Sequence, residues 1–198
     1  ERVGGNVKLV ESDRDNFKIT SYADLEQARM LVYADRVGLG QDSHKFDENK
    51  KLKLGGVVIP DCAGLEANSD GDVILHALFN ALSQAVGGKS LGFYADPLCE
   101  KGIKDSSIYL GIAMDMVKEK GFTIENIGIM LECKKPRLEK FEELIKGNVA
   151  KLCKIEHSQV GLTVTSGEGL TAWGKGEGIQ CFCLALLKKR SSPVVDEP

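Results

Sequence analysis

The stretch Gly38-Leu39-Gly40-Gln41-Asp42-Ser43-His44 places a carboxylate and an imidazole two positions apart. Side chains at this spacing point to the same face of a β-strand, so a strand over 36–46 presents Asp42 and His44 together. A second stretch, Ser69-Asp70-Gly71-Asp72-Val73-Ile74-Leu75-His76, leads into a predicted helix that carries another histidine. One carboxylate and two histidines form a common ligand set for a catalytic zinc ion with an open coordination position. The two stretches therefore predict a metal site between a strand and a helix.

The helix predicted over 70–86 is amphipathic, and this pattern decides where His76 points. At about 100° per residue, apolar side chains fall on one stripe and polar side chains on the opposite side. The apolar stripe consists of Ile74, Leu75, Leu78, Ala81, Leu82 and Ala85, and the polar side of Asp72, His76, Asn80 and Ser83. His76 is therefore expected on the polar side, away from the core. From the spacing alone, a solvent-exposed histidine without a ligand role is the alternative.

The start of this helix predicts a binding place for phosphate. Ser69 or Asp70 can cap the free backbone N–H groups, and Ser69 and Asp72 have the spacing of a capping box. A helix N-terminus beside a divalent cation is well suited to holding phosphate oxygens. We therefore expect a phosphorylated substrate.

The composition of the 198-residue chain is that of a globular protein, and it argues against several classes of function. The net charge of −3 and the lack of a long Lys/Arg run argue against binding nucleic acid through its phosphates. No apolar run is long enough to cross a bilayer and no signal peptide is recognised, so a membrane partner is not expected. The six cysteines form no C-x-x-C pair, which indicates buried free thiols in a reducing compartment. Because the chain opens on Glu1, we expect it to be part of a longer protein.

Residues 35–189 have the pattern of one α+β domain. Strands are expected at 36–44, 55–60, 123–133, 160–165 and 179–187, and helices at 70–86, 106–120 and 136–152. A charged loop over 45–53 and Pro60 are expected to end the first two strands, while Pro136 is expected to open the last helix. Segment 89–104 has no clear period and is expected to be a mobile loop. This order predicts a mixed sheet with helices packed on one face and oligomerisation covering the other.

The two ends of the chain differ from this domain. A short strand at 7–11 and a helix at 21–31 capped by Ser21 cannot bury enough surface to fold alone. Residues 1–34 are therefore expected to belong to another domain or to pack on the main one. The charged, proline-containing tail 190–198 is expected to be disordered.

A glycine-rich loop over 166–178 follows a predicted strand directly. Thr165, Ser166 and the neighbouring glycines allow backbone N–H groups to approach phosphate oxygens closely. Glu168 is a candidate ligand for a second hard cation such as Mg²⁺. The loop lacks the G-x-x-x-x-G-K-[ST] pattern of a P-loop, and a plain turn is the alternative.

These motifs together resemble the 2-C-methyl-D-erythritol 2,4-cyclodiphosphate synthase family of the non-mevalonate isoprenoid pathway. The resemblance covers about residues 35–189 and rests on G-x-D-x-H, S-D-G-D-V-x-x-H, K-x-P at 134–136, and the loop ending G-K-G-E-G. It implies an α+β homotrimer with active sites between subunits. It also implies zinc on Asp42, His44 and His76, and Mg²⁺ or Mn²⁺ on Glu168.

The resemblance further implies the reaction and the roles of residues. The substrate, 4-diphosphocytidyl-2-C-methyl-D-erythritol 2-phosphate, attacks its own β-phosphate and releases CMP, as in a phosphorus–oxygen lyase. Ser166 and Asn68 match positions that stabilise the transition state, Lys175 matches an arginine on the nucleotide phosphates, and 133–139 matches the cytosine pocket. Substrate contacts fall on Asp42, His44, Asn68, Ser69, Ser90, Gly92, Cys133, Lys135, Pro136, Arg137, Thr165, Ser166, Glu168 and Lys175.

The chain departs from the family pattern at several of these positions. Asn68 stands where the family has histidine, and Ser90 where it has an aspartate that contacts the erythritol hydroxyls. Asn80 replaces a frequent aspartate, and Ala172-Trp173 replaces a phenylalanine region. A catalytically weak trimeric scaffold domain is therefore the alternative function, and a zinc hydrolase acting on another nucleotide diphosphate is a third.

The N-terminal residues carry a second resemblance. Asn16–Thr20 followed by Asp24-Leu25 is similar to the C-terminal end of 2-C-methyl-D-erythritol 4-phosphate cytidylyltransferase, with Lys18 matching a substrate-site lysine. This implies that a fused cytidylyltransferase domain precedes the synthase domain in a bifunctional protein. The implied location is the cytoplasm of a bacterium or a plastid-like organelle.

Overall fold

The computed structural model describes residue 4, residue 11 and the ranges 18–32 and 35–189. The chain divides into two compact units, Ala34–Arg190 and a second that contains Glu1–Tyr33 and Ser191–Pro198, and each is described by itself. The strand predicted at 7–11 falls outside the described residues apart from Glu11, and so does the tail 190–198.

The N-terminal unit contains the helix α1 (Tyr22–Val32), close to the predicted bounds. Its cap is the predicted one, because the Asp24 N–H donates to Ser21 Oγ at 3.2 Å. The Asp24 carboxylate in turn accepts the N–H groups of Thr20 and Ser21, each at 2.8 Å. These backbone hydrogen bonds lower the pKa of Asp24 to about 2.

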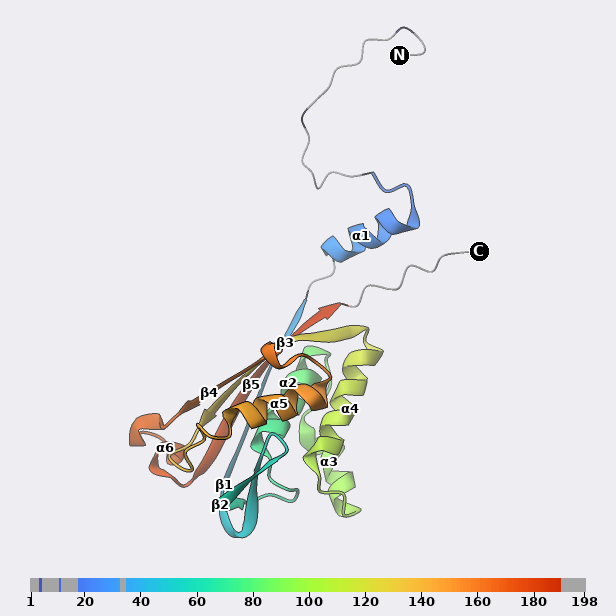
Figure 1. The fold of residues 1–198 in the computed structure, drawn as a ribbon. Helices are drawn as coiled ribbons and strands as arrows, with labels where there is room; N and C mark the ends of the chain where they lie inside the picture. Colours follow the sequence, from blue (N-terminus) through green and yellow to red (C-terminus); the bar gives the residue numbers. More distant parts are fainter. Residues whose placement is uncertain (1–3, 5–10, 12–17, 33–34, 190–198) are drawn as a thin grey trace. The chain divides into compact units, whose positions relative to one another are not determined.

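The main unit is built on a mixed five-stranded sheet with the strand order β2-β1-β5-β3-β4 (Figure 1). The strands are β1 (Arg36–Leu54), β2 (Val57–Leu65), β3 (Phe122–Glu132), β4 (Val160–Thr165) and β5 (Gly178–Lys189). Only the pair of β3 and β4 is parallel, while the other neighbours run antiparallel. The α+β class and the mixed sheet that the sequence predicts are confirmed.

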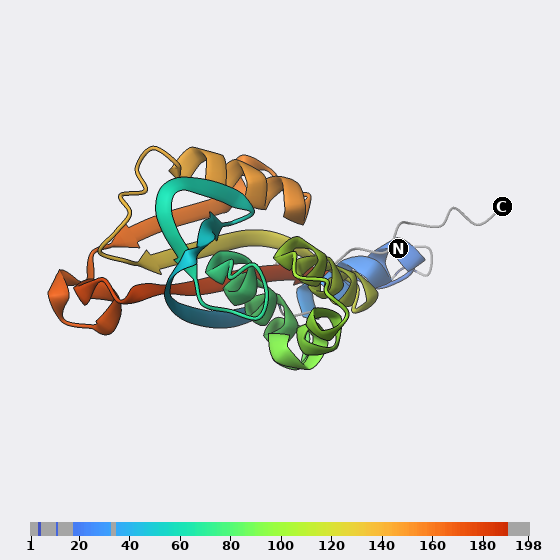
Figure 2. The same ribbon diagram turned by 90° about the horizontal axis from the view of Figure 1, so that it is seen from below.

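The helices of this unit gather on one face of the sheet (Figure 2). They are α2 (Val73–Ala85), α3 (Leu91–Glu100), α4 (Ser106–Glu119) and α5 (Glu142–Cys153). The short α6 (Ala172–Lys175) and the 3₁₀ turn η2 (Gly167–Gly169) lie apart from them, at the end of the sheet between β4 and β5, and a second 3₁₀ turn, η1 (His157–Gln159), precedes β4. Within 35–189 the opposite face exposes apolar side chains, among them Leu39, Met130 and Leu184. In the described part of the chain, no helix has the length and apolar character needed to cross a membrane.

The first two strands are longer than predicted. The expected loop over 45–53 is wrong, because β1 continues through it and its second half pairs with β2, from Phe46 opposite Leu65 to Leu54 opposite Val57. The expected stop at Pro60 is also wrong. β2 lies at the edge of the sheet, where a residue without an N–H group leaves no ladder bond unmade.

Segment 89–104 is not a loop, since most of it forms α3. Its apolar residues Leu91, Tyr94, Ala95 and Leu98 follow the i, i+3, i+4, i+7 spacing of a helix and pack against the core. Pro97 lies inside this helix and hid the period from the sequence interpretation.

Two helices begin later than predicted. Pro136 does not open α5, because residues 133–141 form turns and α5 begins at Glu142. The helix expected from residue 70 begins at Val73, and its cap is Asp72 rather than Ser69 or Asp70. Ser69 instead accepts the Gly71 N–H at 3.2 Å, within the loop before the helix.

The amphipathic interpretation of α2 is wrong. Apart from Asn80 and Gln84, every residue of this helix is buried, and His76 is only 4% exposed. The helix lies directly on β1, where a Cβ atom at Gly40 would come within 1.9 Å of Ala77 O and 2.4 Å of Ala81 N. Only glycine permits this approach. The sheet covers one side of α2, and the neighbouring helices α3 and α4 pack against it as well.

A buried carboxylate joins the start of α2 to the turn between β1 and β2. Asp72 is fully buried, and its side chain accepts N–H groups from Gly55 at 2.8 Å, Gly56 at 2.6 Å and Leu75 at 3.1 Å. Burial raises the pKa of Asp72 to about 6, although these hydrogen bonds oppose the shift.

Four of the six cysteines are buried, as predicted: Cys133, Cys153, Cys181 and Cys183. Cys181 and Cys183 are neighbours on one face of β5, with their sulfur atoms 3.8 Å apart. Burial raises the pKa of Cys181 well above its ordinary value, and the neighbouring Cys183 adds to the shift.

We predict that Gly40→Ala destabilises the protein by at least about 3 kcal/mol, because the new methyl group must displace the backbone of α2. Urea unfolding followed by circular dichroism measures the loss. Gly111→Ala is the matched control, since Gly111 lies on the exposed side of α4 with open space at its Cβ. This control should be neutral or more stable by up to about 1 kcal/mol. Equal stabilities for the two variants would contradict the close-approach argument.

We also predict a pH dependence that originates at Asp72. Its folded pKa of about 6 exceeds the ordinary value of 3.8, so the folded protein holds this proton more tightly. The contribution to stability is therefore complete below about pH 4 and is lost as the pH rises through about 6, by about 3 kcal/mol. Asp72→Asn should remove this part of the pH dependence. Unfolding free energies measured for both proteins between pH 4 and 7 test it, and parallel curves would refute it.

Candidate metal centre

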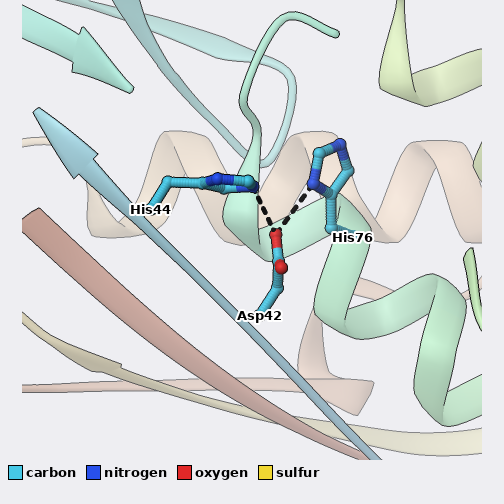
Figure 3. Close-up of side chains that lie close together, drawn as sticks. All are labelled: Asp42, His44 and His76. Atoms are coloured by element: carbon cyan, nitrogen blue, oxygen red, sulfur yellow. Dashed lines mark hydrogen bonds and ion pairs between the residues drawn. The ribbon is translucent and has the colours of Figure 1, made fainter. Parts of the chain in front are cut away.

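Three side chains from two elements converge at one point of the main unit (Figure 3). Asp42 and His44 project from the same face of β1, and His76 comes from the first turn of α2. One ligand atom of each residue lies within 4.8 Å of the other two. The convergence that the sequence predicts is confirmed, and we call these residues the triad.

Both imidazoles of the triad face the same carboxylate oxygen. His76 Nδ1 lies 2.8 Å from Asp42 Oδ2, and His44 Nε2 lies 3.0 Å from that oxygen. The two rings are 5.6 Å apart at their centres and are inclined at 73° to each other. This places two ring nitrogens and a carboxylate around one small volume, as in three-ligand metal sites.

The donor set fits a divalent cation. His44 Nε2 is buried and makes no hydrogen bond of acceptable geometry, despite its short distance to Asp42. Burial alone would raise the pKa of Asp42, but the hydrogen bond with His76 and the close approach of the His44 and His76 rings outweigh it and hold the pKa well below its usual value. A cation would satisfy the unpartnered nitrogen and the ionised carboxylate together. That this cation is zinc stays a prediction.

Two serine hydroxyl groups lie beside His76 Nε2, on the side of the ring away from Asp42. His76 Nε2 lies 2.8 Å from Ser106 Oγ and 3.1 Å from Ser69 Oγ. Ser106 is the first residue of α4, and its hydroxyl donates to the carboxylate of Asp70. The sequence interpretation missed Ser106 and the role of Asp70. The only available signal was an Asp-Ser pair at the start of a helix, which by itself indicates a cap.

A hollow of about 160 Å³ lies beside the triad. It is lined by Asp42, His44, Ala67, Asn68, Ser69, His76, Leu91, Gly92, Ala95, Asp96, Cys99 and Tyr109. The predicted substrate contacts Asn68, Ser69 and Gly92 are therefore brought together with the triad. Ser90 is the residue before α3, next to this lining. The loop that carries Asn68 is held by Lys50, whose ammonium group donates to the carbonyls of Ala67 and Ser69.

Other predicted site residues line a second hollow of about 420 Å³. Its lining consists of Cys133, Lys134, Pro136, Arg137, Leu138, Glu139, Glu142, Val164, Thr165 and Ser166. Burial raises the pKa of Cys133 to about 11, so its thiol is protonated at neutral pH and acts as a packing or weakly hydrogen-bonding group. The two hollows share no lining residue, so within one chain the predicted site is divided.

Glu168 and Lys175 lie outside both linings. Glu168 sits in η2 with a φ of 49°, and its carboxylate accepts a hydrogen bond from Ser166 Oγ at 3.0 Å. Lys175 ends α6. Lys135 places its ammonium group 5.5 Å from the centre of the Phe46 ring. Among the described residues, the cluster that could hold a metal is the triad, and it does not include Glu168.

The phosphate site expected at the start of α2 is wrong. Gly71, Asp72 and Val73 are buried, so the N-terminus of this helix does not open into the hollow beside the triad. The carboxylate of Asp72 already occupies the cap position and would repel a phosphate group.

The fold and the triad define this chain as an α+β protein with a candidate metal-binding site. Residues 35–188 match the YgbB family, and the chain belongs to that family.

Named relatives agree with this assignment. The 2-C-methyl-D-erythritol 2,4-cyclodiphosphate synthase of Chlamydia muridarum is 42% identical over 153 residues, which cover 75% of this chain and 85% of that protein. IspF of Plasmodium falciparum, in complex with CDP, superposes with a TM-score of 0.69 at 28% identity, covering 79% of this chain and 97% of that one. The bifunctional IspDF from Campylobacter jejuni superposes with a TM-score of 0.76 at 31% identity, covering 96% of this chain and 52% of that one.

We predict that His76→Ala weakens zinc binding by at least about 100-fold, because one of three protein ligands is lost. Isothermal titration of the chelator-treated protein measures the affinity, and metal analysis gives the stoichiometry. His157→Ala is the control, since this histidine lies on the surface beside Glu143 and should bind zinc as the wild type does. Binding that is unaffected in His76→Ala would show that the triad is not the metal site.

Proposed function

We propose that the chain converts 4-diphosphocytidyl-2-C-methyl-D-erythritol 2-phosphate to 2-C-methyl-D-erythritol 2,4-cyclodiphosphate and CMP in isoprenoid biosynthesis. The observation that carries this proposal is the intact triad of Asp42, His44 and His76 on the family fold. The name shared by the relatives and the CDP bound to IspF of Plasmodium falciparum support it.

The reaction needs positioning and charge neutralisation rather than a covalent intermediate. Asp42, His44 and His76 would hold the zinc ion, and Glu168 the Mg²⁺ or Mn²⁺ ion. Bound metal supplies Lewis-acid neutralisation of the phosphate oxygens. The chain then holds the 2-phosphate oxygen in line with the β-phosphorus, and the bond from that phosphorus to the CMP oxygen breaks as the new P–O bond forms.

Neutral donors would complete the charge neutralisation in this chain. The Asn68 amide and the Ser166 hydroxyl can each donate one hydrogen bond to the oxygens that gain charge. Lys175 would pair with the nucleotide phosphates, and the hollow that contains Cys133 and Arg137 would receive the cytosine. Asn68 provides no positive charge, so we expect a slower reaction than a histidine at this position would give.

The proposed enzyme is a homotrimer. The sheet face without helices carries a hollow of about 410 Å³ lined largely by apolar residues, including Leu39, Met130, Phe182 and Leu184. An apolar face of this kind is typical of a subunit interface. A neighbouring subunit would also bring its Ser166 and Cys133 hollow to the triad, which explains why the site is divided within one chain.

The N-terminal residues 1–34 are proposed to be the end of a fused cytidylyltransferase domain, and 35–189 the synthase domain. The bifunctional IspDF from Campylobacter jejuni, which superposes on 96% of this chain, supports this division. The cytoplasm of a bacterium or a plastid-like organelle stays the predicted location. The weak-scaffold alternative is less favoured because the triad is complete.

We predict that the protein releases CMP from the diphosphocytidyl substrate in the presence of Zn²⁺ and Mg²⁺. His76→Ala should reduce the rate by at least about 100-fold, because it removes a metal ligand. Chromatography of the nucleotide and phosphorus NMR of the product measure both outcomes. An open-chain product would indicate a hydrolase instead.

A second variant separates the enzyme from the scaffold. Asn68→His combined with Ser90→Asp should raise the rate by about 10-fold or less if the site is adapted to its own residues. A gain of several orders of magnitude would favour the weak scaffold.

A further inference from the structure

Each ring nitrogen of His76 has a polar partner. On the side away from Asp42, the partner Ser106 is itself fixed by a hydrogen bond to Asp70. His76 Nδ1 faces Asp42 Oδ2 at 2.8 Å, and its Nε2 faces Ser106 Oγ at 2.8 Å. The ring is almost completely buried, so water does not compete for these contacts. Asp42 Oδ2 is also an acceptor, so Nδ1 is left without a proton only when a cation binds there, and the partners of Nε2 must then hold the proton.

The hydroxyl proton of Ser106 is already committed. Ser106 Oγ donates to Asp70 Oδ1, and the Ser106 N–H donates to Asp70 Oδ2 at 3.2 Å. A hydroxyl group has one proton to donate and otherwise only accepts. With its proton on Asp70, Ser106 presents lone pairs to His76, so Nε2 must be the donor.

A lysine keeps Asp70 in the role of acceptor. Lys53 Nζ lies 2.8 Å from Asp70 Oδ2 and 3.2 Å from Asp105 Oδ1. An ionised carboxylate accepts hydrogen bonds but donates none. Lys53 lies at the end of β1, Asp70 in the loop before α2 and Ser106 at the start of α4. Together they form a connected support for the His76 ring.

We propose that Ser106 is a positioning residue, and that Asp70 and Lys53 act through it to keep the proton of His76 on Nε2 and leave Nδ1 to bind the metal. Ser69 does not impose this choice. Its oxygen accepts the Gly71 N–H at 3.2 Å and lies 3.1 Å from His76 Nε2, where the Ser69 hydroxyl can either donate or accept. The inference rests on the metal site of the proposed function, since it concerns how one ligand of that site is oriented.

The test is zinc affinity, measured by competition with a chelator of known affinity. Ser106→Ala should raise the dissociation constant by about 10- to 100-fold, the usual effect of removing an outer-shell partner of a metal ligand. Lys53→Met should raise it by a smaller factor of about 3 to 10 in the wild type, and should have no further effect when Ser106 is already alanine. Additive effects of the two substitutions would overturn the proposed connection.

The matched control is Ser83→Ala. Ser83 is also a fully buried serine, and its hydroxyl donates to Lys89 O at 2.6 Å, so its removal costs stability without touching the support of His76. Its zinc affinity should equal that of the wild type. A loss of affinity as large as that of Ser106→Ala would mean that both act only through stability.

A spectroscopic measurement distinguishes positioning from simple packing. In the zinc-loaded protein labelled with ¹⁵N-histidine, the Nε2–H of His76 should exchange slowly with water, and Ser106→Ala should accelerate this exchange. Ser106→Thr retains the hydroxyl group and should retain slow exchange. If Ser106→Ala does not fold, Lys53→Met and Ser106→Thr still decide the question by their affinities.

The outcomes separate this inference from the proposed function. A wild-type protein that binds no zinc would overturn the metal site itself. A wild type that binds zinc and a Ser106→Ala variant within about twofold of its affinity would overturn only the positioning role.

Discussion

The close contact between the backbones of α2 and β1 is the constraint on which the rest of this structure depends. Gly40 allows Ala77 O to approach the strand to a distance that no side chain would permit. Two residues further along the strand is Asp42, and one residue earlier on the helix is His76. The packing of helix on strand therefore fixes the metal ligands as well, because the ligands are the immediate neighbours of the contact.

A second contact prevents the helix from sliding along the strand. Asp72 binds the N–H groups of Gly55 and Gly56 in the turn that ends β1, so the helix is held at its N-cap as well as at its middle. The cost is a carboxylate without access to water, which three hydrogen bonds offset in part. The triad is thus built on rigid elements, whereas Ser166 and Glu168 lie on a glycine-rich loop.

The sequence predicted the parts of the structure that depend on local pattern. The alternation in β1 placed Asp42 and His44 on one face, and the ligand set that these two residues form with His76 predicted that the three meet at one site. What depends on tertiary contacts was missed. α2 was expected to have a polar side because its pattern looks amphipathic, yet neighbouring helices cover that side too. Ser106 reaches His76 only because α4 packs beside α2, and no spacing in the sequence encodes that contact.

The adjacent thiols of Cys181 and Cys183 give the core a chemical property of its own. Both are without solvent contact, and burial raises the pKa of Cys181 well above its ordinary value, so the thiolate of Cys181 is absent while the sheet is intact. Alkylating reagents can reach these sulfur atoms only when β5 separates from its neighbours. The rate at which Cys181 and Cys183 are alkylated therefore measures how often the centre of the sheet opens.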